Sequence, residues 1–111
     1  AKVVGGAPMY TCRAWVNFNG VSGTPSIRAS GNISSLTDNG VGDYTVNFTT
    51  AMPHANYSTV ATGSDTTIPR PVPFGIRAST INVVRLIQWH MTGTSGQSAF
   101  DGDINTVATF C

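Results

Sequence analysis

Strict alternation of apolar and polar residues is the feature that most constrains this chain. It runs from Cys12 to Phe18 and returns, in its cleanest form, at Tyr44, Val46 and Phe48. Successive side chains of a β-strand point to opposite faces, so each segment predicts a strand with one face in the core. No capped helical periodicity longer than two turns occurs anywhere in the sequence. The chain is therefore expected to fold from strands alone.

Glycine, asparagine and aspartate mark the turns between these strands. Asn19-Gly20 ends the first strand, and residues 26–35 predict a second, weakly alternating strand. Gly31 inside it indicates either a bulge or a close approach of another part of the backbone. Residues 37–43 are rich in residue types that tolerate positive φ, and predict the tip of a hairpin.

The rest of the chain is predicted as short strands separated by turns and loops. These are a turn at 51–56, a strand at 57–62, a loop at 63–75, a strand at 81–91, a loop at 92–98 and a strand at 103–110. Alternating prolines in the first loop argue against a central strand there. The predicted fold is all-β, an antiparallel β-sandwich of short strands with long Gly/Pro/Ser-rich loops. Residues 1–11 are interpreted as an entry segment or linker, and 12–111 as a single β-sandwich domain.

Size and charge exclude several classes of function. A chain of 111 residues holds one modest core and has no room for a separate cofactor domain, so no cofactor is expected. Only 10% of its residues are charged and its net charge is +1, which provides no field for nucleic acid or anionic lipid. No apolar run approaches the length of a membrane span, so no membrane insertion is expected. Low surface charge leaves little repulsion against self-association.

The two cysteines leave two alternatives open. A bridge between Cys12 and Cys111 would tie the ends of the sheet together. The interpretation we favour is a buried thiol at Cys12, on the inward phase of its strand, and an unpaired thiol at Cys111.

Catalysis is not expected. The sequence has no glutamate, and Asp101-Gly-Asp103 is more typical of a turn before the last strand than of a metal site. His54 and His90 have no second histidine or cysteine at ligand spacing, so zinc is not expected. A small glycan-cleaving enzyme would need two carboxylates that face each other across a groove. No nucleophile elbow of the G-x-S-x-G type occurs either. The chain is therefore not expected to be an enzyme.

Two loops contain the residues best suited to binding. Segments 63–75 and 92–103 combine planar apolar faces with directional polar groups, the combination that binds sugars. The candidate binding residues are Asp65, Arg70, Phe74, Gln97, Phe100 and Asp101. The alternative is that these loops are solvated connections. Trp15 and Trp89 are possible stacking platforms, but their strand positions favour packing in the core or between subunits.

One long stretch resembles a known module. CRAWVNFNG, followed by IRASGNISSLTDNGVGDYTVNFTTAMPHANYS, is similar to a module at the C-terminal ends of bacteriophage tail-fibre and related tail proteins. The matching residues are Arg13 to Gly20, Ile27 to Pro53 and Ala55 to Tyr57, about a third of the chain. The departures from the family pattern are Leu36, Val41 and His54.

The resemblance implies a setting rather than a reaction. It implies a virion protein made in the bacterial host cytoplasm, with a β-rich fold, a homotrimer and other virion tail proteins as partners. It supplies no catalytic or metal-binding residue. The expected function is host attachment through a surface polysaccharide or an outer protein, with recognition in residues 63–103, where the match fades. The alternative is a structural virion domain (decoration, fibre cap or assembly module) with no host ligand.

Overall fold

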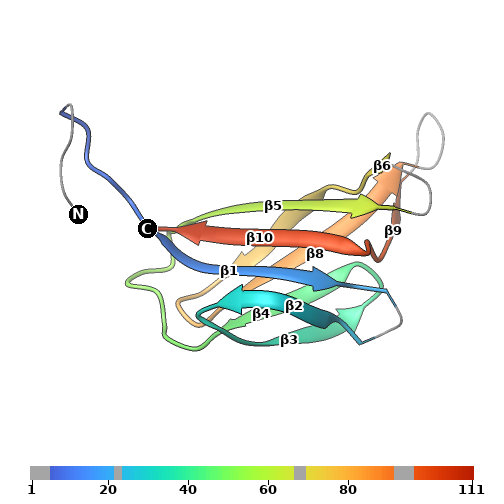
Figure 1. Cartoon of the computed structure of the whole chain (residues 1–111), viewed down its shortest axis with the longest axis horizontal. Helices are drawn as coiled ribbons and strands as arrows, with labels where there is room; N and C mark the ends of the chain where they lie inside the picture. Colours follow the sequence, from blue (N-terminus) through green and yellow to red (C-terminus); the bar gives the residue numbers. More distant parts are fainter. Residues whose placement is uncertain (1–5, 22–23, 67–69, 92–96) are drawn as a thin grey trace.

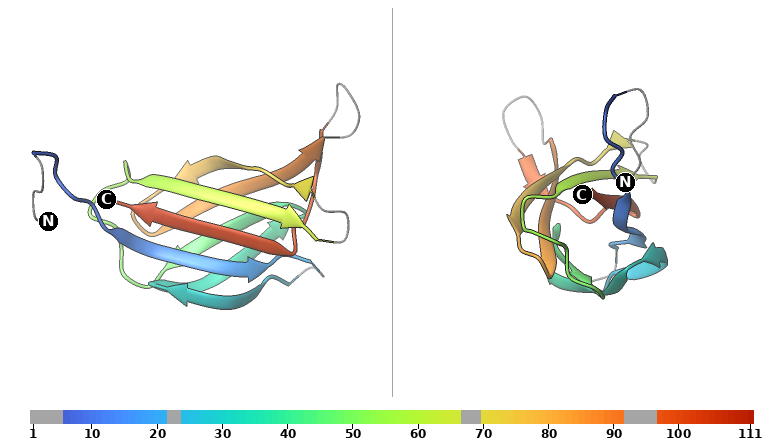
Figure 2. Two further views of the ribbon diagram at one scale, coloured as in Figure 1. Left: turned by 45° about the horizontal axis from the view of Figure 1, so that its top comes forward. Right: turned by 90° about the vertical axis from the view of Figure 1, so that its left-hand side faces the viewer.

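Two antiparallel sheets face each other across one core (Figures 1 and 2). The structure is a computed structural model, and it describes residues 6–21, 24–66, 70–91 and 97–111. No helix in this part of the chain is long and apolar enough to cross a membrane. The all-β sandwich predicted from the alternation is confirmed.

The first sheet has the strand order β2-β1-β10-β5-β6. Its strands are β1 (Cys12–Asn19), β2 (Ser26–Gly31), β5 (Ser58–Asp65), β6 (Arg70–Pro71) and β10 (Ile104–Phe110). The second sheet has the order β3-β4-β8-β7, and β9 pairs with the end of β8. Its strands are β3 (Ile33–Gly40), β4 (Asp43–Phe48), β7 (Phe74–Ser79), β8 (Val83–Met91) and β9 (Gln97–Ala99).

The core lies between the inner faces of the two sheets. Its buried apolar residues are Ala14, Val16, Phe18, Tyr44, Val46, Phe48, Met52, Tyr57, Val84, Leu86 and Val107. Nine of them come from the alternating positions of β1, β4, β8 and β10, as the period of two predicts, whereas Met52 and Tyr57 lie in the connection between β4 and β5. Phe18 of one sheet packs edge-on against Tyr44 of the other, with ring centroids 5.1 Å apart. The sequence pattern therefore identifies the residues that join the two layers.

The predicted strand over 26–35 is in fact two strands that belong to different sheets. The chain leaves β2 of the first sheet at Gly31 and enters β3 of the second at Ile33, with Asn32 at a φ of 58° between them. Asparagine tolerates this left-handed conformation better than most residues. The close approach at Gly31 comes from a side chain and not from the backbone, because an added Cβ there would meet the indole of Trp15.

The β3–β4 hairpin is confirmed, but its tip is shorter than the predicted 37–43. β3 continues to Gly40 and β4 begins at Asp43, so only Val41 and Gly42 lie between them. Gly40 and Gly42 both have positive φ, at 141° and 65°. The pairing register shifts between Asp38 and Gly40, so Asn39 is an extra residue of β3.

The predicted 63–75 loop contains more regular structure than expected. β5 continues to Asp65, and the two-residue strand β6 pairs with its end. The sequence pattern does not predict β7, because a bulge between Ile76 and Ala78 breaks its alternation. Val72, inside this segment, is fully buried. In the other predicted loop, residues 92–96 lie outside the described residues, while residues 97–99 form β9.

Cys12 is exposed, which corrects the prediction of a buried thiol. The register shifts between Cys12 and Ala14, so Arg13 is an extra residue and Cys12 pairs with the outward-facing Phe110. The bulge thereby reverses the face that the alternation assigned to Cys12. Cys12 and Cys111 are both free thiols.

Candidate binding surface

The described parts of the candidate loops, residues 63–66, 70–75 and 97–103, lie at one end of the sandwich. The outer ends of β1 and β10, Cys12 and Phe110, lie at the other end (Figure 1). Backbone hydrogen bonds tie the loop end together. The Gly20 amide donates to the Gly102 carbonyl at 2.9 Å, and the Asp103 amide donates to the Ser64 carbonyl at 3.1 Å. Segments that are distant in the sequence are thus held side by side.

Asp101 lies inside this end and anchors it. One oxygen of its carboxylate accepts hydrogen bonds from the Gly42 amide, at 2.8 Å, and from the Tyr44 hydroxyl. The carbonyl of Gly20 lies 3.3 Å from the same hydroxyl. Burial, together with the neighbouring carboxylate, raises the pKa of Tyr44 well above its usual value. The phenol therefore stays protonated and donates to Asp101.

Two buried amide side chains fix the same end from within the core. The side-chain amide of Gln88 donates to the side-chain oxygen of Asn105 at 2.7 Å and to the Val72 carbonyl at 3.1 Å. Its own oxygen accepts from the Gly102 amide at 3.0 Å, and Asn105 donates to the Gly102 carbonyl at 2.8 Å. Both side chains are almost wholly buried. Because each polar atom has a partner, the network holds Gly102 rather than destabilising the core.

The structure brings the six predicted binding residues to this one end, but largely as part of its frame. Asp65 is buried at the end of β5, and Arg70 pairs opposite it in the backbone register. Phe74 is half-buried against the core, and Phe100 and Asp101 are half-buried too. The side chains of Arg70 and Gln97 lie outside the described residues. Their role in binding stays a prediction.

A groove on the outer face of the second sheet lies beside these loops, and sequence reasoning did not single it out. It has a volume of about 300 Å³ and is lined by Val41, Gly42, Asp43, Arg77, Ile87, Gln88, Trp89, Ser98 and Ala99. Asp43 and Gly75 pair with Ile87 from the two neighbouring strands. The signal that could have located it is the outward phase of β8, which places Ile87 and Trp89 on one face.

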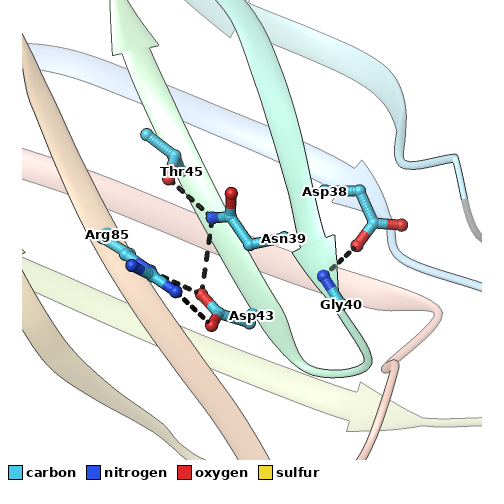
Figure 3. A network of polar contacts seen from close by, with 6 residues as sticks. All are labelled: Asp38, Asn39, Gly40, Asp43, Thr45 and Arg85. Carbon is cyan, nitrogen blue, oxygen red and sulfur yellow. Dashed lines mark hydrogen bonds and ion pairs between the residues drawn. The ribbon is translucent and has the colours of Figure 1, made fainter.

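An ion pair lies next to the groove, between Asp43 on β4 and Arg85 on β8 (Figure 3). Two parallel bonds, at 2.9 and 2.7 Å, join the guanidinium to the two carboxylate oxygens. Asn39 donates to Asp43 at 3.4 Å and to the Thr45 hydroxyl at 2.7 Å. The bonds from Arg85 lower the pKa of Asp43 below its usual value. Asp43 is thus a charged and already partnered carboxylate.

A second groove of about 300 Å³ lies at the opposite end of the molecule. It is lined by Tyr10, His54, Asn56, Tyr57, Ser58, Phe110 and Cys111. The Cys111 sulfur lies 3.3 Å from Nε2 of His54. Within the ranges that the structure describes, no three histidine, cysteine, aspartate or glutamate side chains gather in a way that could hold a metal ion.

Asp103 and the two tryptophans complete the comparison with the sequence. Asp103 accepts hydrogen bonds from the amide and hydroxyl of Thr66, which lower its pKa. Trp15 is outside the core, with 43% of its surface exposed, and Trp89 is half-buried beside the groove.

Comparison of the chain with known proteins gives no match to a family model, to a curated protein or to a solved structure.

Proposed function

We propose that this chain is a tail-fibre-type module of a bacteriophage virion that attaches the particle to its host. The observation that carries the proposal is the resemblance of residues 13–20, 27–53 and 55–57, in this order, to the tail-protein module. Read on the structure, the residues of this match build β1 to β4, the hairpin and the turn before β5. They are scaffold, and the proposal places recognition in the remaining half of the chain.

The arrangement of the loops supports attachment. Their described parts gather at one end of the sandwich. Residues 6–11 leave the sandwich at the other end, next to Cys12 (Figure 1). A module held through its residue-6 side would present this end outward. Loops on a rigid sandwich often carry recognition, and repeating them around an axis converts weak contacts into avidity.

The proposal includes a homotrimer, for which the outer face of the first sheet is suited. Trp15, Ala108 and Val60 form a cross-strand row there, since Trp15 pairs with Ala108 and Ala108 with Val60. Trp15 and Val60 are 43% and 59% exposed, and Phe110, at the end of the same face, is 37% exposed. Apolar side chains grouped in this way are typical of a surface that contacts another protein.

A structural virion domain without a host ligand is the second candidate. The observation that favours it is the inward engagement of Asp101 and the burial of Asp65. Both of these polar side chains stabilise the loop end instead of projecting from it.

Two measurements on the purified chain test the proposal. Light scattering gives the mass in solution, for which we expect three times 11.6 kDa. Binding of the fluorescently labelled trimer to host cells, and to polysaccharide extracted from them, tests attachment. A folded trimer that binds neither cells nor polysaccharide would support the structural candidate and contradict attachment. A monomer at micromolar concentration would contradict the trimer.

A further inference from the structure

We propose that the groove between the β3–β4 turn and Trp89 binds a saccharide that carries a carboxylate. Arg77 is the charge partner of the carboxylate, and Trp89 is the apolar wall for the sugar ring. The inference rests on the proposed attachment function, for which it names a site and a ligand class. Its test uses small soluble sugars and therefore does not depend on host cells.

Glycine at position 75 leaves room for the indole of Trp89, which lines the groove. The ring atoms Cζ3 and Cη2 of Trp89 lie 3.1 Å from the point where a Cβ of Gly75 would stand. Ile87 lies 3.6 Å from the same point. The indole therefore extends over the neighbouring strand next to an aliphatic side chain. Carbon–hydrogen faces of sugar rings pack well against such aromatic and apolar surfaces.

The charges in and beside the groove leave one cation available. Arg85 and Asp43 neutralise each other through their two short bonds, and Asn39 adds a third donor to the carboxylate. Arg77 is exposed at the bulge of β7. Among the described residues, no hydrogen bond or ion pair is formed by its guanidinium. It has only a longer-range attraction to Asp43. A carboxylate of the ligand matches the fork of this guanidinium, because its two oxygens can accept two parallel hydrogen bonds.

The size and rim of the groove suit one or two sugar units. A volume of about 300 Å³ lies at the lower end of the range for small-ligand sites. Ser98 offers a hydroxyl at the rim, and Val41, 61% exposed, adds an apolar edge at the hairpin turn. Among the residues that the structure describes here, the combination of one free cation, one aromatic wall and few other polar groups favours an acidic sugar over a neutral one.

Titration of the intact chain with methyl glucuronide and with methyl glucoside tests the proposal, because the two sugars differ only in the carboxylate. Tryptophan fluorescence in the Trp15→Phe background reports on Trp89. We expect saturable binding of the glucuronide in the millimolar range and about tenfold weaker binding of the glucoside, as the loss of a charge-assisted hydrogen bond predicts. Equal binding of the two sugars, or no saturable change with the glucuronide, overturns the proposal.

Three variants locate the site. Arg77→Ala should remove the preference for the glucuronide, and Arg77→Lys should retain part of it because the charge remains without the fork. The matched control is Arg13→Ala, which removes an exposed arginine at a bulge of the other sheet. Circular dichroism and thermal unfolding confirm that each variant is folded. A glucuronide affinity that is unchanged in Arg77→Ala, or equally lowered in Arg13→Ala, contradicts the assignment.

A competition arm separates a sugar from an acidic protein segment. A fluorescently labelled glucuronide serves as the probe. If a short polyglutamate peptide displaces it as well as methyl glucuronide does, the groove recognises only the carboxylate and the saccharide assignment is wrong. The host-cell assay remains independent. If the Arg77→Ala variant still binds host cells, the groove is not the attachment site, but the attachment function itself stands. If the trimer binds the glucuronide but does not bind host cells, only the attachment function is contradicted.

Discussion

The Tyr44 hydroxyl donates a hydrogen bond to the carboxylate of Asp101, a residue 57 positions later in the chain. Tyr44 belongs to the central strand β4, and Asp101 belongs to the segment that enters the last strand. The same carboxylate oxygen also accepts from the Gly42 amide. One side chain thus connects the hairpin turn, the core and the loop end of the sandwich.

Replacement of Tyr44 by phenylalanine tests this connection. Tyr44→Phe keeps the ring that packs on Phe18 but leaves a half-buried carboxylate with one donor fewer. We expect the free energy of unfolding to fall by about 1–3 kcal/mol, the usual cost of an unpaired polar group. Chemical denaturation at neutral pH measures it.

Tyr57→Phe is the matched control for this prediction. The Tyr57 hydroxyl lies 2.9 Å from the carbonyls of Thr80 and Val83, which are uncharged. Its removal should cost about 1 kcal/mol or less, because bonds to neutral acceptors contribute less than bonds to charged ones. An equal or larger loss in Tyr57→Phe would show that the charge of Asp101 adds nothing.

Two glycines of the hairpin separate backbone strain from crowding. Gly40 and Gly42 both have positive φ, so alanine is strained at either position. A Cβ at Gly40 meets nothing within 4 Å, whereas one at Gly42 meets the Gln88 carbonyl and the backbone of Phe100. We expect Gly42→Ala to destabilise the fold by about 1–3 kcal/mol more than Gly40→Ala. Thermal unfolding of the two variants gives the difference, and equal melting temperatures would argue against the crowding.

Acidification should weaken the fold through the pair of Asp43 and Arg85. Because Arg85 lowers the pKa of Asp43 in the folded state, its contribution is complete above the ordinary carboxyl value of 3.8 and is lost as pH falls through the lower folded value. Unfolding free energies measured between pH 6 and pH 2, at about two-unit steps, should therefore decline below about pH 4. The decline should be smaller in Asp43→Asn.

The remaining acid dependence of Asp43→Asn has a source of its own. Asp103 also has a lowered pKa, through its bonds from Thr66, so its contribution is likewise lost as the pH falls below the ordinary carboxyl value. Asp103→Asn therefore serves as the comparison. An acid profile of Asp43→Asn identical to that of the original chain would exclude a stabilising role for the ion pair.

The outer row of Trp15, Ala108 and Val60 is the place to break the proposed trimer. Val60→Glu puts a charge on a side chain that is 59% exposed, so the isolated subunit should fold unchanged while its association is lost. Ile76→Glu, at a 49% exposed position of the other sheet, is the control and should stay trimeric. Light scattering distinguishes the two, and a trimer that persists in Val60→Glu would place the interface elsewhere.

Local pattern predicted the strands whose alternation is unbroken, and missed the places where one residue changes the register. The inward residues of β1 and β4 follow from the period of two. The bulge at Arg13 turns Cys12 outward, and the bulge near Arg77 breaks the alternation by which β7 could have been predicted. The turn at Asn32 depends on distant partners. Its side chain bonds the backbone of Arg13, at 3.1 Å, and of Thr50, at 2.8 Å. No local signal contains such contacts.

The candidate site was predictable only as a region. The composition of the loops around Asp65 and Asp101 predicts a binding region, and the described parts of these loops do meet at one end of the sandwich. The bonds that turn Asp101 inward join segments far apart in the sequence, so spacing could not reveal them. The groove was missed for the same reason, since it forms only when β4, β7 and β9 align beside β8.

The chain itself crosses between the sheets on both long sides of the sandwich. It passes from β2 to β3 through Asn32, and from β6 to β7 through the buried Val72. Open sheet edges are templates on which identical chains add strands and form aggregates. Here the edge strands β2 and β6 lead directly into the opposite layer, and β6 is only two residues long. Each crossing shortens the straight edge on which a second copy of this chain could add a strand.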